Sequence, residues 1–214
     1  MPPPRGPGRP PAGADVHDRE SIIRVAMDVF SRRGYEGTSM RDLAEAAGIT
    51  APSIYHHVEG KADLLREGLS AALESLYAVL DEDAMRDGPA VDRLRHVLRR
   101  TVEVTIERLP EVALLVRVRG DSEVEKWAVD RRRRFDRSVE RVVEQAQAEG
   151  DVRRDLDASL VTRLAFGMIV SIVEWYRPEG GRREPEGPKG PRGKLSPGQV
   201  ARAVEALVLE GLTP

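Results

Sequence analysis

Apolar positions recur every three or four residues along most of this chain, a spacing typical of helices that bury one face. The pattern predicts a first helix from residue 18 to Gly34, two short helices between residues 38 and 60, and a fourth from Lys61 to about Met85. Further helices are predicted over residues 90–108, 110–120, 122–149, 157–177 and 197–211, with Gly, Pro or Asp at their ends. We therefore predict an all-α fold.

The two short helices form a motif between Thr38 and Lys61. Ser39 can cap the first helix, and Gly48 stands where the chain would leave it in a left-handed conformation. Thr50 can cap the second helix, and small Ala44 allows the two helices to cross closely. This predicts a helix-turn-helix whose second helix enters a DNA major groove, with an ordinary αα-hairpin as the alternative.

Composition supports helices and narrows the class of protein. Charged residues make up 33% of the 214 residues and aromatic residues only 4%, and there is no cysteine for disulfides, thiolate metal sites or a thiol nucleophile. The net charge of -2 argues against coating of nucleic acid but not against binding of one operator. No apolar run approaches the ~20 residues of a membrane span, and residues 1–17 lack the apolar core of a signal peptide. We expect a cytoplasmic protein that does not contact membranes.

Two segments rich in Pro and Gly lie outside this helical pattern. Residues 1–17 are expected to form a disordered tail, or alternatively an arm whose Arg5 and Arg9 reach DNA. Residues 178–195 are too long for a helix connection and are expected to be a mobile insertion, or alternatively a flap or partner contact. The expected domains are residues 18–60, which bind DNA, and residues 61–214, which bind an effector and a second subunit.

The run AMDVFSRRGYEGTSMRDLAEAAGITAPSIYHHVEGKADLL, residues 26–65, resembles the DNA-binding domain of the TetR family of bacterial transcription regulators. The matching pieces are an aromatic-Gly-Tyr exit from the first helix, T-S-x-R-D-L-A, A-G-I, S-I-Y-x-H and G-K-x-D-L-L. Val58 departs from the family, which usually has Phe there, and this suggests a slightly different packing. The resemblance implies a bacterial DNA-binding regulator.

Chemistry and resemblance together select the candidate DNA contacts. Thr50 and Ser53 place hydroxyls at the start of the recognition helix, and Ala51 and Pro52 offer apolar surface to a thymine methyl. The family contacts phosphate at the positions of Tyr55 and His56, although Tyr55 could instead be a packing residue. Phosphate is also the expected ligand of two further cations, Arg41 and Lys61. The pair His56 and His57 has no companion at metal-ligand spacing, so no metal site is expected.

The resemblance also implies a homodimer on two-fold operator DNA, formed through helices 157–177 and 197–211, and a small-molecule effector that releases DNA. The surplus apolar surface of helix 157–177 fits such a dimer. Candidate effector contacts are apolar residues and cations, each of which could instead be plain core or solvated surface: Leu98, Val102, Leu115, Arg119, Trp127, Arg131, Phe135, Phe166 and Val170.

The run EWYRPEGG, residues 174–181, resembles a segment of TetR-type regulators of lipid and sterol catabolism, whose effectors are acyl-CoA thioesters. Arginines at Arg117, Arg119, Arg131–Arg134 and Arg177 could meet the phosphates of such a ligand. The competing effector is a hydrophobic drug or metabolite, as for a regulator of efflux. A DNA-binding protein without an effector, or an activator, is a weaker alternative. No catalytic constellation or cofactor motif supports an enzyme.

Overall fold

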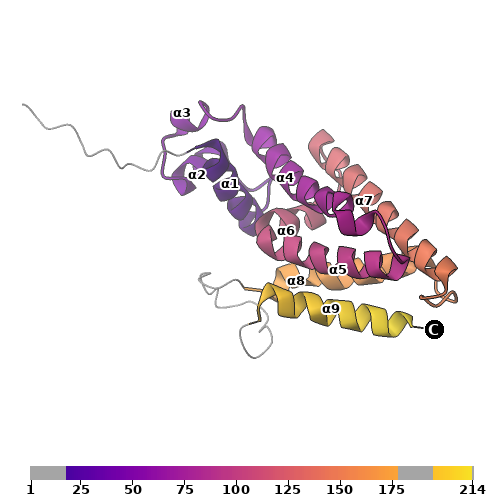
Figure 1. Ribbon diagram of the computed structural model, residues 1–214. Helices are drawn as coiled ribbons and strands as arrows, with labels where there is room; N and C mark the ends of the chain where they lie inside the picture. The colour runs from indigo at the N-terminus through magenta and orange to yellow at the C-terminus, as the bar shows by residue number, and fades with distance from the viewer. Residues whose placement is uncertain (1–17, 178–194, 214) are drawn as a thin grey trace, which may run out of the picture.

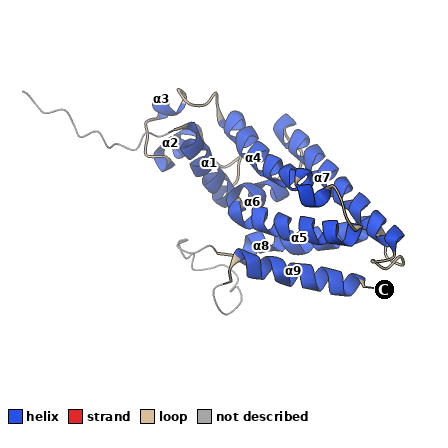
Figure 2. Ribbon diagram, in the orientation of Figure 1, coloured by secondary structure: helices blue, strands red, loops and turns tan. Residues whose placement is uncertain are grey.

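The computed structural model describes residues 18–177 and 195–213, and every regular element in this part of the chain is helical (Figures 1 and 2). The elements are α1 (Arg19–Arg33), α2 (Met40–Ala46), α3 (Ala51–Ile54), α4 (Lys61–Asp81), the 3-10 turn η1 (Asp83–Met85), α5 (Ala90–Glu107), α6 (Leu109–Arg117), α7 (Glu123–Glu149), α8 (Ala158–Trp175) and α9 (Pro197–Leu212). The predicted all-α fold is confirmed. The predictions for residues 1–17 and 178–194 lie outside the described residues.

Helices α1, α2 and α3 gather at one end of the molecule (Figure 1). Their apolar faces meet in a shared core, where Phe30, Leu43 and Ile54 are almost fully buried. Ala44 is also buried, as expected if a small side chain lets α2 pack closely. Local sequence sets the ends of these helices, and the caps at Ser39 and Thr50 both form.

The remaining helices form a bundle around α5. Helix α5 packs against α4, α6, α7, α8 and α9, and α9 runs along the outer edge of the bundle (Figure 1). Helix α4 belongs to both regions because it packs against α1 on one side and against α5, α6 and α7 on the other. At the α1–α4 crossing, a Cβ on Gly68 would overlap the side chain of Met27, so a larger residue there would require Met27 to move. One continuous hydrophobic core therefore joins the two regions.

Two predicted helices end earlier in the structure. Helix α4 stops at Asp81, since Glu82 adopts an extended backbone (ψ 145°) before η1 begins. The side chain of Glu82 binds His96 and Arg100 on α5, which gives this break in the helix a tertiary cause. Helix α6 stops at Arg117 because Val118 is extended (ψ 137°), three residues before the predicted end.

Helix α8 corrects the expectation that no segment approaches a membrane span. Its 18 residues have a mean hydropathy of 1.4, enough by length and composition to cross a membrane, and 33% of them are buried. A core helix of a globular protein can have the same composition, and α8 packs against α5, α6, α7 and α9. Its exposed apolar residues are Leu160, Leu164 and Met168, which recur every four residues and so form one stripe.

Candidate DNA interface and effector cavity

Helices α2 and α3 are held at a fixed angle by their caps and by one turn. Ser39 and Asp42 cap each other reciprocally, with Ser39 N to Asp42 Oδ2 at 2.8 Å and Asp42 N to Ser39 Oγ at 3.2 Å. Gly48 has a φ of 69°, a left-handed conformation that favours glycine, and Ile49 N then donates to Ala44 O. The short helix α3 is therefore set by local hydrogen bonds and by buried Ile54.

Most of the candidate DNA contacts lie on the surface of this motif. Arg41, Ala51, Pro52 and His56 are exposed, and Tyr55 has 56% of its surface in solvent. A large aromatic side chain that is half exposed beside the recognition helix is free to contact a macromolecule. Exposure thus agrees with a surface role for Tyr55 and not with the packing alternative.

Thr50 and Ser53 are engaged with each other. Thr50 Oγ1 accepts from Ser53 N at 3.3 Å, and the two hydroxyl oxygens lie 2.8 Å apart. The Thr50 hydroxyl therefore caps α3, and the Ser53 hydroxyl lies in hydrogen-bond contact with it. A hydroxyl accepts more than one hydrogen bond, so this capping still leaves acceptor capacity for a base or a phosphate-bound water.

Lys61 lies in a different environment from the one expected. Its ammonium donates to Tyr35 O at 2.9 Å and stands 4.2 Å above the centre of the Tyr35 ring. Lys61 thus ties the start of α4 to the segment that follows α1. Burial raises the pKa of Tyr35, with smaller contributions from Glu36 and Glu125. If Lys61 also contacts a DNA phosphate, its ammonium must bind the phosphate and the Tyr35 carbonyl at the same time.

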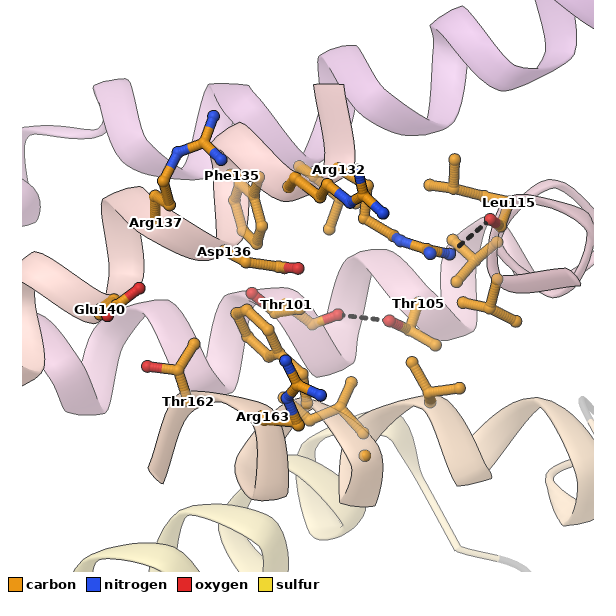
Figure 3. Close-up of a pocket in the computed structure, with 18 of the residues that line it drawn as sticks. Thr101, Thr105, Leu115, Arg132, Phe135, Asp136, Arg137, Glu140, Thr162 and Arg163 are labelled. Atoms are coloured by element: carbon orange, nitrogen blue, oxygen red, sulfur yellow. Dashed lines mark hydrogen bonds between the residues drawn. The ribbon is translucent and has the colours of Figure 1, made fainter. Parts of the chain in front are cut away.

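A cavity of about 670 Å³ lies between α4, α5, α6, α7 and α8. Its size falls within the usual range of small-molecule sites, roughly 300–1,000 Å³. Phe135 and Phe166 stack in its lining with their ring centres 5.6 Å apart, and Leu115 and Val170 extend the apolar lining. Phe135 and Leu115 are labelled in Figure 3. These four residues from three helices are the predicted effector contacts that the structure brings together.

The other five predicted effector contacts lie outside this cavity. Leu98 and Val102 are at most 1% exposed and belong to the core. Arg119 is on the surface after α6. Trp127 and Arg131 instead take part in cation–π contacts. The Arg66 guanidinium lies 4.7 Å from the centre of the Trp127 ring, and the Arg131 guanidinium lies 4.6 Å from the centre of the Tyr77 ring. Helical spacing marks these positions as inward-facing but does not say which inner surface they reach.

Part of the polar lining of the cavity was predicted, because Arg132 and Arg133 belong to the run Arg131–Arg134, but the other polar lining residues were not. Four arginines line it, Arg132, Arg133, Arg137 and Arg163, together with two carboxylates, Asp136 and Glu140. Arg132, Phe135 and Asp136 are three and four residues apart, so they share one face of α7. Reading this face instead of the whole four-arginine run would have selected Arg132 and Asp136.

Two polar side chains in the cavity lack partners in the described part of the chain. Thr101 is only 5% exposed, and its Oγ1 is buried without a hydrogen bond. Asp136 extends into the cavity from α7, opposite Thr101 (Figure 3), and arginines reach its carboxylate only as nearby charges. In contrast, the hydroxyls of Thr105 and Thr162 donate to backbone carbonyls of their own helices.

Two arginines connect the cavity to the DNA-binding end. Arg132, which lines the cavity, donates from Nη1 to Leu115 O near the end of α6 at 2.8 Å (Figure 3). Two residues further along α6, Arg117 Nη1 donates to Ser31 O in α1 at 2.7 Å. Helix α6 therefore bridges the cavity wall and the first helix of the DNA-binding region.

Known proteins match both parts of the chain. Residues 22–67 match the family described as "Bacterial regulatory proteins, tetR family", and residues 87–186 match the "Tetracyclin repressor-like, C-terminal domain". The crystal structure of SCO3833, a TetR-family member from Streptomyces coelicolor, is 49% identical, covers 90% of this chain and 91% of its own, and superposes with a TM-score of 0.79. This chain belongs to the TetR family. It is thus a DNA-binding transcriptional regulator and not an enzyme.

Other members of the TetR family are also similar over most of their length. The HTH-type transcriptional repressor KstR2 of Mycobacterium tuberculosis is 28% identical over 210 residues, which cover 94% of this chain and 96% of KstR2. The structure of that ketosteroid transcriptional regulator has a TM-score of 0.79. AibR, solved with isovaleryl coenzyme A and operator DNA, shares the fold at 22% identity with a TM-score of 0.71 and covers 88% of this chain and 96% of its own.

Replacing Asp136 by asparagine is expected to stabilise this TetR-family regulator at neutral pH. Burial raises the pKa of Asp136, and the charges of Arg132, Arg137 and Arg163 offset this only in part. Ionisation of Asp136 therefore costs stability as pH rises through its folded pKa, and the cost is absent below the unfolded pKa of about 3.9. D136N should raise the midpoint of thermal unfolding at neutral pH, by about 2–4 °C per kcal/mol, and the gain should vanish at about pH 3.

The matched control is Asp130→Asn on the same helix. Asp130 is exposed and pairs with Arg134 at 2.6 Å, so its substitution removes the same charge from the protein surface and not from the cavity. D130N should leave the midpoint nearly unchanged. A D136N protein that is no more stable than wild type at neutral pH contradicts the unfavourable burial of Asp136.

Proposed function

We propose that this protein is a homodimeric repressor whose DNA affinity falls when an acyl-CoA thioester occupies the cavity between α4 and α8. The cavity itself carries the proposal. Its stacked phenylalanines offer an apolar slot for an acyl chain, and its arginines outnumber its carboxylates four to two, which suits the phosphates of coenzyme A. An uncharged hydrophobic drug would make no use of the charge of these arginines.

The DNA-binding half of the proposal rests on the exposed face of the helix-turn-helix. Thr50, Ala51, Pro52 and Ser53 are proposed to face base edges. The proposed phosphate contacts are Arg41, Tyr55, His56 and Lys61, with Lys61 shared between phosphate and Tyr35. A two-fold operator with half-sites about one DNA turn apart would match two copies of this motif.

The dimer half rests on apolar surface that one protomer leaves uncovered. Leu160, Leu164 and Met168 form a stripe on α8, and Leu207 on α9 is 67% exposed. Large apolar side chains clustered on adjacent helices mark a protein contact more often than isolated ones do. We propose that helices 157–177 and 197–211 pack against the same pair of a second subunit, and that the dimer acts in the bacterial cytoplasm.

Coupling between the two sites would run through α6. Arg132 holds Leu115 O, and Arg117 on the same helix holds Ser31 O in α1. An anionic effector that attracts Arg132 would release the end of α6 and change the position of α1. AibR was solved with isovaleryl coenzyme A, which is an effector of this chemistry, and KstR2 is named as a ketosteroid regulator, which fits an apolar ligand body.

The test is an operator-binding titration with a panel of effectors. The duplex is the intergenic DNA beside the gene, and the ligands are acyl-CoAs of increasing chain length with their matched free acids. We expect at least one acyl-CoA to raise the operator Kd by about 5–150-fold, the usual range of coupling between sites. The free acids should act more weakly because they lack the coenzyme A phosphates. An operator complex that every acyl-CoA leaves intact removes this effector class.

The matched variants are Arg132→Met and Arg134→Met. Both remove one arginine from α7, but only Arg132 lines the cavity, while Arg134 is exposed and pairs with Asp130. R132M should lose most of the response to acyl-CoA, and R134M should keep it. Equal responses in the two variants would assign no role to Arg132.

A further inference from the structure

The cavity holds a polar pair that the proposed acyl and phosphate contacts do not use. Thr101 reaches it from α5, and Asp136 reaches it from α7 (Figure 3). The buried Thr101 hydroxyl has no hydrogen-bond partner in the described residues, although nearly all buried polar groups in proteins do. The Asp136 carboxylate, which is half-buried, accepts no hydrogen bond from the described residues. Burying the Thr101 hydroxyl without a partner costs stability, and a ligand that bonds to it would remove that cost.

The hydrogen-bonding capacity of the pair defines what would satisfy it. The carboxylate of Asp136 only accepts, whereas the Thr101 hydroxyl both donates and accepts. A ligand hydroxyl satisfies both at once, because it can donate to Asp136 while it accepts from Thr101. A ligand carbonyl could pair with Thr101 alone and would face the carboxylate of Asp136 without a hydrogen.

The charges around the pair exclude the other donor of the same size, an ammonium group. Arg132, Arg137 and Arg163 surround Asp136 closely enough for their charges to act on it, and Arg133 also lines the cavity. A cationic ligand would be repelled by these arginines, whereas a neutral hydroxyl on an otherwise anionic ligand is not.

We propose that Asp136 and Thr101 are a specificity pair that selects an effector with a hydroxyl group on its apolar body, in addition to its anionic end. This rests on the proposed acyl-CoA response and adds the class of acyl group: the preferred ligand is a hydroxylated acyl thioester. The pair sits beside the stacked rings of Phe135 and Phe166, so the hydroxyl lies partway along the apolar slot.

The experiment compares decanoyl-CoA with its isomers that carry one hydroxyl at successive chain positions. Binding to the full-length protein is measured by calorimetry. One isomer should bind at least about tenfold tighter than decanoyl-CoA, since a hydrogen bond to a charged group contributes about 1.5–3 kcal/mol and 1.4 kcal/mol is tenfold. Hydroxyls at the other positions should bind no tighter than decanoyl-CoA, because Asp136 and Thr101 cannot reach them.

The variants are Asp136→Asn, Thr101→Val and the double substitution, with Asp130→Asn as control. D136N leaves a neutral acceptor and T101V keeps the shape without the hydroxyl, so each should reduce the preference to about threefold or less and the pair together should abolish it. The preference is therefore calculated within each variant, as the ratio of its affinities for the hydroxylated isomer and for decanoyl-CoA, and thermal unfolding of each variant shows that it folds. D130N lies outside the cavity and should keep the full preference.

The outcomes separate the two proposals. Equal binding of all isomers, or a preference that survives in the double variant, overturns the specificity pair and leaves the acyl-CoA response standing. Failure of every compound to bind overturns both proposals. A preference that is lost only with Asp136 and Thr101 supports the pair.

Discussion

Replacing Leu164 by glutamate is expected to yield a monomer that no longer holds its operator. Leu164 is 64% exposed at the centre of the apolar stripe on α8, between Leu160 and Met168. In a two-fold dimer the same residue is present on both sides of the interface, so a single substitution buries two unpaired charges. Breaking a buried charge pair by removing one partner costs about 3–5 kcal/mol, and an unpaired glutamate at an interface is comparable.

Operator affinity should fall with the dimer. Two linked recognition helices gain about 10²–10⁴ in affinity over one, because the second contact forms at a high effective concentration. The measurements are the mass in solution by light scattering, which should drop from twice 23.7 kDa to 23.7 kDa, and the operator Kd by anisotropy. Both should change together at micromolar protein.

The matched control is Ala78→Glu. Ala78 is exposed on α4, away from α8 and α9, so the substitution adds the same charge to a helix surface outside the proposed interface. A78E should remain dimeric and bind DNA. If wild type already has the mass of one subunit, or if L164E stays dimeric, the α8 stripe is not the interface.

Replacing Tyr55 by alanine is expected to weaken operator binding by about 5–150-fold without loss of stability. Each protomer would lose one contact to phosphate, and a hydrogen bond of this kind contributes about 0.5–1.5 kcal/mol, counted twice in a dimer. Stability should hold because more than half of the side chain, 56%, is already in solvent. The measurements are operator titration at fixed salt and thermal unfolding.

Tyr55→Phe separates the hydroxyl from the ring. If the hydroxyl contacts phosphate, Y55F should lose nearly as much affinity as Y55A; if the ring packs against the sugar, Y55F should bind almost like wild type. Unchanged operator affinity in both variants would remove Tyr55 from the interface. A lower midpoint of unfolding in Y55A would instead return it to a packing role.

Much of the fold could be predicted from the sequence because its helices are specified locally. The caps at Ser39 and Thr50, the left-handed turn at Gly48 and the buried spacing of Leu43 and Ile54 each depend on residues a few positions apart. The shortened end of α4 could not be predicted in this way. It depends on Glu82 binding His96 and Arg100, 14 and 18 residues further along the chain.

The candidate sites also combine features set by local sequence with features set by contacts between residues distant in the chain. The sequence by itself determined that α2 and α3 form a helix-turn-helix with Tyr55 beside the recognition helix, because short-range hydrogen bonds and helical periodicity fix that motif. Only the tertiary structure decided that Lys61 rests on Tyr35, 26 residues away, and that Arg117 holds Ser31, 86 residues away. It also decided that Asp136 faces Thr101 across one cavity. Periodicity tells which residues point inward, but the packing of five helices decides which of them meet.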